Sequence, residues 1–106
     1  MLYASILLFI APLALPAQQA DSIPAFPGAE GFGSYTPGGR GGRLLRVTNL
    51  DASGPGSLQW ALDQEGPRVV VFDTCGVIRT DLTIRHGGLT ILGQTAPGAG
   101  ITIHGK

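Results

Sequence analysis

Short apolar runs alternate with breaks of Gly, Pro, Asp and His between Arg68 and Lys106. Each run is too short for a helix and is rich in β-branched residues, whose restricted χ1 angle suits the pleated surface of a sheet. The pattern therefore predicts strands. They are expected at residues 69–72, 77–78, 82–84, 89–92 and 101–103, with a further strand upstream at 43–48.

Three of these runs, at 82–84, 89–91 and 101–103, share an apolar-Thr-apolar pattern. In a strand this pattern places two apolar side chains on one face and a hydroxyl on the other. The strand-turn-strand pattern returns after roughly twenty residues, which is within the range of solenoid coils. No gap between the runs carries the Asn-Gly or Asp-Gly dipeptide that favours tight hairpins. We therefore expect an all-β fold built as a stacked parallel solenoid, with an ordinary β-sandwich as the alternative.

A short helix is expected before the strongest strand. Ser57 can cap its start, and Leu58, Ala61 and Leu62 then form a narrow apolar stripe at positions i, i+3 and i+4. The Gly66-Pro67 pair is a typical stop signal. Because so short a helix is held only by packing, we expect it to cover the open end of the solenoid.

The N-terminal stretch from residue 4 to residue 15 is apolar and uncharged, but it is too short to span a bilayer and contains Pro12. The small residues Ala17 and Ala20 precede the first charge, Asp21. We expect residues 1–20 to be a secretory signal peptide, with a buried N-terminal strand or helix as the alternative. Residues 21–106 would then form part of a secreted protein, extracellular or periplasmic, with no membrane contact after the signal is removed.

Length and charge narrow the class of protein further. With 106 residues there is room for one domain at most. Seven Lys and Arg are dispersed among seven Asp and Glu, so the chain has no basic patch of the kind that nucleic acid or an anionic membrane requires. Partners of those two classes are therefore not expected.

The single cysteine and the two histidines give weak signals for chemistry. Cys75 has no partner for an internal disulfide and is expected to be a small buried apolar residue rather than a nucleophile. His86 and His104 lie far apart, without nearby Cys or paired carboxylates. They are expected at the surface or at corners rather than as metal ligands.

Two glycine-rich stretches and one terminal motif could suggest nucleotide binding. Residues 31–33 and 38–42 are dense in glycine, and residues 100–106 match the start of a phosphate-loop pattern. None of them is expected to lead from a strand into a helix, which those motifs require. Across the whole glycine-rich region at 24–42, the rings of Phe26, Phe32 and Tyr35 favour an ordered loop over a flexible linker.

Three arginines near the same stretch, Arg40, Arg43 and Arg46, could converge on an anion. Solvated side chains at the start of a strand are the favoured interpretation.

Six blocks in fixed order resemble the N-terminal region of secreted bacterial pectate lyases and related polysaccharide lyases. Gln59 stands where those proteins often have Arg, and Cys75 stands where a small polar residue is common. The blocks are AFPGAEGFG at 25–33, GGRGG at 38–42, VTNL at 47–50, SGPGSL at 53–58, VFD at 71–73 and ILGQTAPG at 91–98.

The resemblance implies a right-handed parallel β-helix, of which residues 21–106 are the first coils, with a capping helix at 57–65. It also implies cleavage of pectate-type uronic-acid polymers by β-elimination in a full-length enzyme, which is expected to be a monomer. In that chemistry calcium binds the substrate carboxylate and acidifies the proton on C5, and an arginine removes this proton.

The family residues for this chemistry belong to later coils. Asp73 and Asp81 lie in the opening coil, where the family has structural residues. No catalytic, cofactor-binding or metal-binding residue is therefore assigned, and this part alone is expected to be inactive. The alternative is a non-catalytic β-solenoid that binds carbohydrate or acts in adhesion.

Overall fold

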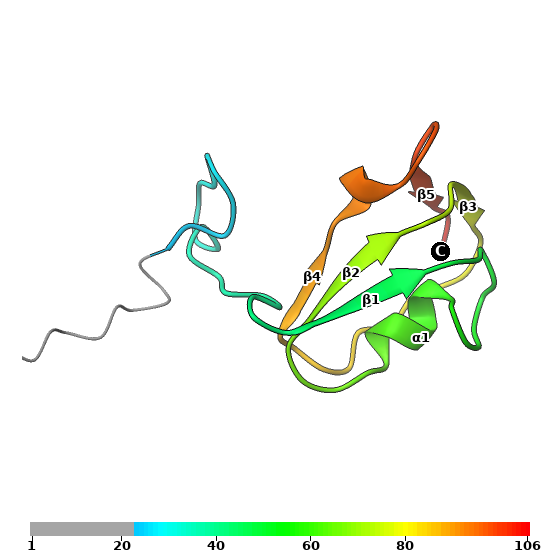
Figure 1. Cartoon of the computed structure of the whole chain (residues 1–106), viewed down its shortest axis with the longest axis horizontal. Coiled ribbons are helices and arrows are strands. Elements are labelled where there is room, and N and C mark those ends of the chain that lie inside the picture. Colours follow the sequence, from blue (N-terminus) through cyan, green and yellow to red (C-terminus); the bar gives the residue numbers. More distant parts are fainter. Residues whose placement is uncertain (1–22) are drawn as a thin grey trace, which may run out of the picture.

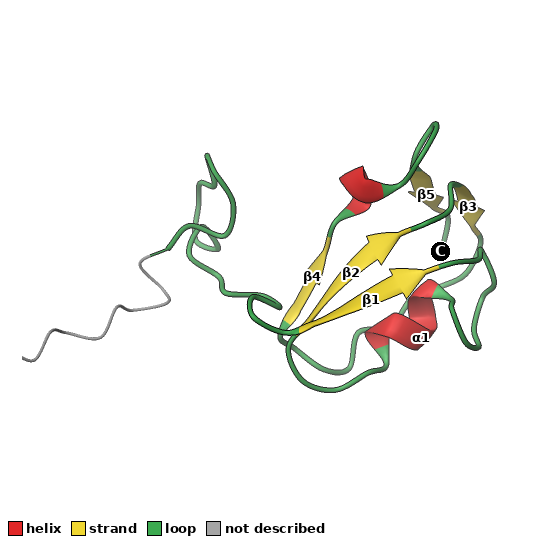
Figure 2. Ribbon diagram, in the orientation of Figure 1, coloured by secondary structure: helices red, strands yellow, loops and turns green. Residues whose placement is uncertain are grey.

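The fold is taken from a computed structural model that describes residues 23–106. The expected signal peptide at 1–20 lies outside these residues. The described part is strand-rich with little helix, which confirms the all-β expectation (Figures 1 and 2). Within residues 23–106 no helix is both long and apolar enough to cross a membrane. The elements are β1 (Arg43–Val47), α1 (Leu58–Leu62), β2 (Arg68–Phe72), β3 (Gly76–Ile78), β4 (Leu89–Ile91), the 3₁₀ helix η2 (Gly93–Thr95) and β5 (Ile101–Ile103).

The strands form two parallel sheets. One sheet has the order β1-β2-β4 and the other pairs β3 with β5. In the first sheet Arg43 lies opposite Arg68, and Arg68 lies opposite Leu89. In the second sheet Gly76 lies opposite Ile101. Paired residues of β3 and β5 are therefore separated along the sequence by the same number of residues as paired residues of β1 and β2. Because every pairing among the described strands is parallel, an ordinary antiparallel β-sandwich does not describe this part of the chain.

The core lies on one face of the larger sheet, against α1 (Figure 2). Alternate residues of β2 are buried, as the period of a strand requires. The expected stripe of Leu58, Ala61 and Leu62 is fully buried. The Ser57 side chain accepts a hydrogen bond from the Trp60 N–H at 3.1 Å, which confirms it as the helix cap. The helix is shorter than the expected 57–65.

The prediction of a strand at 82–84 is wrong, because the backbone of these residues is irregular in the structure. The Gln59 side chain explains this. Its Nε2 donates to the Thr83 carbonyl oxygen and its Oε1 accepts from the Thr83 N–H, both at 3.0 Å. A side-chain amide offers the same donor and acceptor as a peptide group, so Gln59 takes the place that a neighbouring strand would fill.

The glycine-rich stretch at 38–42 is an ordered loop, as expected, but the rings are not the reason. Phe26 and Phe32 are exposed. The loop is held instead by close backbone contact. The Gly39 N–H donates to the Thr90 Oγ1 at 2.8 Å, and a Cβ at Gly39 would overlap the Arg68 carbonyl oxygen.

Candidate functional site

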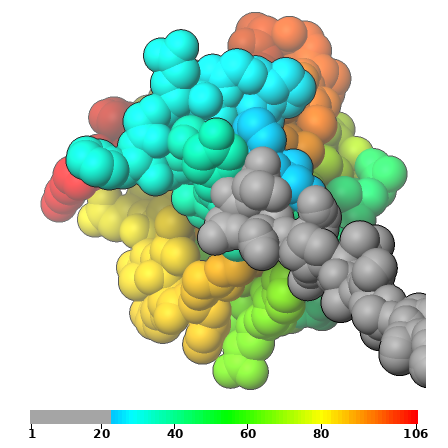
Figure 3. All heavy atoms as spheres, turned by 90° about the vertical axis from the view of Figure 1, so that its left-hand side faces the viewer, coloured from blue at the N-terminus to red at the C-terminus, as the bar shows by residue number. Residues whose placement is uncertain are grey.

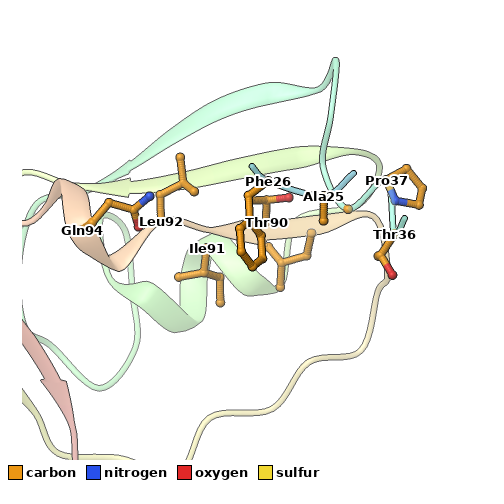
Figure 4. Close-up of a pocket in the computed structure, with 10 residues that line it drawn as sticks. Ala25, Phe26, Thr36, Pro37, Thr90, Ile91, Leu92 and Gln94 are labelled. Carbon is orange, nitrogen blue, oxygen red and sulfur yellow. The ribbon is translucent and has the colours of Figure 1, made fainter. Parts of the chain in front are cut away.

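The N-terminal segment and β4 enclose a hollow of about 480 Å³ (Figure 4). In Figure 3 the blue and cyan N-terminal segment is seen in front of the sheets, and Figure 4 shows its Phe26 and Thr36 on the same hollow as Thr90 of β4. Thr36, Thr90 and Gln94 provide the polar side chains of the lining. The full lining is Ala25, Phe26, Thr36, Pro37, Gly38, Leu89, Thr90, Ile91, Leu92 and Gln94.

None of these ten side chains is ionisable, which limits what the hollow can do chemically. It offers no general acid or base and no carboxylate for a hard cation. Through these ten residues the hollow can contact a ligand by apolar surface and neutral hydrogen bonds.

Arg68 is a fully buried cation on the core face of β2. Its guanidinium donates all five N–H groups to backbone carbonyl oxygens. Nε and Nη2 reach Ala61 and Leu62 at 3.1 and 2.8 Å, at the end of α1, where helix carbonyls lack partners within the helix. The remaining bonds go to Gly66, His86 and Gly87 at 2.8–3.0 Å.

The five acceptors of Arg68 define its role. They belong to the end of α1 and to the turns that precede β2 and β4. Arg68 therefore ties three successive segments together, and its complete enclosure keeps it from any substrate.

The three N-terminal arginines do not converge on one acceptor. Arg40 donates to the Pro24 carbonyl oxygen and Arg43 to the Glu65 carbonyl oxygen, each at 2.9 Å. Arg46 forms an ion pair with Asp73 at 2.8 Å, with both side chains well exposed. The favoured interpretation of separate surface side chains is confirmed.

Cys75 is exposed, so the prediction that it is buried is wrong. It lies in the corner between β2 and β3 rather than on the core face of a strand, which is why its apolar character does not bring it inside. His86 is half-buried, with its Nε2 3.9 Å from the Glu65 Oε1, and His104 is exposed beyond β5. The expectation of surface or corner histidines is confirmed.

Asp73 and Asp81, the two acids of the opening coil, serve separate contacts. Asp73 pairs with Arg46, and the Asp81 Oδ1 accepts from the Lys106 N–H at 2.6 Å. Among residues 23–106, no group of three or more His, Cys, Asp or Glu side chains is placed to hold a metal ion. Calcium needs six to eight oxygen ligands, so these residues do not fit it.

The terminal motif at 100–106 is a strand, as expected. β5 occupies its centre, whereas a phosphate cradle requires a turn that leads into a helix.

A pairing that the sequence did not reveal lies beside this strand. The Arg79 Nη1 is 3.2 Å from the His104 Nδ1. The two residues are separated along the chain by the same offset as the paired residues of β3 and β5. This offset was the available signal, but it has meaning only once the register of the two strands is known.

Strand-rich architecture with little helix and with parallel strand pairing places the described residues in the all-β class. No family model matches the chain. Several proteins named probable pectate lyase C match most of it, and three of them illustrate the match. The Aspergillus flavus protein is 54% identical over 87 residues, which cover 81% of this chain and 20% of that protein. The Aspergillus fumigatus protein is 50% identical over 95 residues, 89% of this chain and 22% of that protein. The Emericella nidulans protein is 50% identical over 101 residues, 94% of this chain and 23% of that protein.

These relatives show that the chain is homologous to the pectate lyase family. The resemblance seen in the sequence is thus confirmed for the family and corrected in one respect, since the matching relatives are fungal rather than bacterial. The chain spans about one fifth of the length of these curated relatives.

Proposed function

We propose that this chain supplies the N-terminal part of a pectate lyase that cleaves uronic-acid polymers by β-elimination. The observation that carries the proposal is the 54% identity over 87 residues to a protein named probable pectate lyase C. The described residues contribute structure rather than chemistry, because their one fully buried ionisable group, Arg68, is enclosed by carbonyl oxygens. Proton abstraction and bond cleavage are proposed to take place on residues outside 23–106.

The proposed architecture is a right-handed parallel β-helix. Support comes from the in-register pairing of β1 with β2 and of β2 with β4, and from the equal offsets of the β1-β2 and β3-β5 pairs. In this arrangement each pass of the chain forms one coil, and α1 covers the core at the β1 side. Such repeats bury their apolar faces by stacking on their neighbours.

Cofactor, location and assembly remain part of the same proposal. Calcium is proposed to bind the substrate carboxylate at acidic side chains outside the described residues. The apolar stretch at 4–15 supports export, and the whole enzyme is proposed to act as a secreted monomer on a pectate-like polysaccharide.

A hybrid protein tests the proposal directly. In the hybrid, this chain replaces the matching stretch of the Aspergillus flavus relative, and the remaining four fifths come from that relative. We expect the hybrid to release unsaturated, ultraviolet-absorbing products from polygalacturonate. A chelator should abolish their release and added calcium restore it. The 106-residue chain alone should release none.

The unmodified relative is the control. If the relative is active while a folded hybrid binds pectate but releases no unsaturated product, the lyase proposal is wrong. A non-catalytic carbohydrate-binding solenoid would then describe this chain.

A further inference from the structure

A second hollow, of about 410 Å³, lies where the chain leaves β3 and β5. Extending the register of the two strands beyond their ends places Arg79 beside His104, Thr80 beside Gly105 and Asp81 beside Lys106. These six residues are the lining of the hollow. It is therefore built by stacking two corners of the chain rather than by one mobile loop.

Close packing fixes the floor of this hollow. The Asp81 Oδ1 accepts from the Lys106 N–H at 2.6 Å, which joins the two corners. A Cβ at Gly105 would lie 2.8 Å from the Asp81 Oδ1 and 2.9 Å from the Thr80 carbonyl oxygen. Only glycine allows this approach without movement, so the charged side chains are carried by a defined backbone.

Arg79 differs from the other arginines that the structure describes. Arg40, Arg43, Arg46, Arg68 and Arg85 all donate to carbonyl or carboxylate oxygens. Arg79 instead donates to the His104 imidazole at 3.2 Å. Because arginine has donors and no acceptor, the His104 Nδ1 is the acceptor in this contact.

The rest of the Arg79 guanidinium is open to a ligand. Within residues 23–106 no carboxylate lies within ion-pair distance of Arg79, and its bond to His104 is the one hydrogen bond that it makes there. The planar guanidinium matches a carboxylate with two parallel hydrogen bonds. The Lys106 side chain adds a second positive charge to the hollow, while the one acidic side chain, that of Asp81, has an oxygen engaged by a backbone N–H.

We propose that Arg79, with His104 and Lys106, forms a binding subsite for a carboxylate group of a uronic-acid polymer, separate from the place where the polymer is cut. The choice of a uronate rests on the proposed function. Arg79 takes the carboxylate, the His104 ring fixes the guanidinium, and Lys106 contributes positive charge. The subsite binds and does not catalyse.

The test is the affinity of the 106-residue chain for an oligomer of galacturonate, followed by calorimetry and by the NMR signals of the Arg79 Nε–H and the His104 ring. Arg79→Gln should weaken binding about tenfold or more, because a charge-assisted pair of hydrogen bonds is lost. Arg85→Gln removes the same charge from an exposed ion pair elsewhere and should change the affinity less than about twofold. Lys106→Gln should have an intermediate effect.

Three ligands separate the possible sources of binding. The methyl-esterified oligomer lacks the charge and should not bind at the same concentration. Acetate and monomeric galacturonate should bind far more weakly than the oligomer. Equal affinity for acetate would overturn the polymer subsite in favour of a general anion site.

Equal effects of Arg79→Gln and Arg85→Gln, or no binding by the wild-type chain, would overturn the proposal. Circular dichroism spectra establish that each variant is folded, and the wild-type NMR shifts locate the site without any substitution. The two proposals fail separately. An inactive hybrid with the Arg79 effect intact refutes the lyase function alone, whereas an active hybrid with no Arg79 effect refutes the subsite alone.

Discussion

The described β-structure has two sides, the β1 side next to α1 and the side with the free edges of β4 and β5. Both contain the same kinds of side chain but bury them to different extents. Leu45, Val70 and Ile91 lie opposite one another on β1, β2 and β4, yet their exposed fractions are 9%, 0% and 38%. On the second sheet Ile78 is fully buried, whereas its partner Ile103 is 47% exposed. The β1 side is covered by α1. On the opposite side, no described residue pairs with the free edges of β4 and β5.

This difference shows that the alternating pattern decides which way a side chain faces but not whether it is buried. Burial requires a neighbouring layer, and in a stacked fold that layer is the next pass of the chain or a cap. The β1 side therefore carries most of the stability of the described part. The β4 and β5 side presents apolar side chains and strand edges to solvent.

The largest effect is expected at Arg68, on the covered side. Arg68→Met keeps an unbranched apolar stem but removes the guanidinium, which leaves five buried or half-buried carbonyl oxygens without this donor. We expect the free energy of unfolding, measured in urea, to fall by about 3 kcal/mol or more. Arg85→Met, which breaks an exposed ion pair, should cost about 1 kcal/mol or less. Similar losses in the two variants would show that the buried network does not hold α1 to the sheet.

The same Ile→Ala substitution, made at two isoleucines that lie opposite each other, compares the stability of the two sides. Ile78→Ala should lower the free energy of unfolding by about 2–5 kcal/mol, because it opens a cavity in the core. Its register partner is half exposed, so Ile103→Ala should cost about 1 kcal/mol or less. The measurement is again urea unfolding of both variants, and a cost at Ile103 equal to that at Ile78 would remove the distinction between the sides.

A smaller, local effect is expected where Gln59 joins α1 to the irregular segment at 82–84. Gln59→Ala removes both hydrogen bonds to the Thr83 backbone and should cost about 1–2 kcal/mol. The specific readout is hydrogen exchange, in which the Thr83 amide should lose protection while amides of β2 keep theirs. Unchanged protection at Thr83 would mean that other contacts order this segment.

Most of the correct predictions from the sequence fall on the covered side. Ser57, the apolar stripe of α1 and the strand expected at 69–72 follow local rules of capping and periodicity. The structure has all three, with β2 beginning one residue earlier, at Arg68. Arg68 was missed as a buried residue because a charge at the start of a strand usually faces water. Its spacing of two from Val70 placed it on the core face, and that was the available signal.

Elsewhere the prediction failed where a partner distant in sequence decided the outcome. Residues 82–84 have the pattern of a strand, but the Gln59 side chain satisfies Thr83 in place of a neighbouring strand. Cys75 is apolar in character but lies in a corner. The pairing of Arg79 with His104 depends on strand register, which no local pattern reveals.

We propose that the exposed side, which carries the free edges of β4 and β5, is a coil surface that further parallel coils cover in the whole enzyme. The most direct test of this proposal is the Ile103→Ala substitution made both in the 106-residue chain and in the hybrid that carries the remaining four fifths of the Aspergillus flavus relative. We predict that the cost rises from about 1 kcal/mol or less in the chain alone to about 2–5 kcal/mol in the hybrid, as Ile103 becomes a core residue. A cost that stays small in a folded, active hybrid would contradict the stacked arrangement.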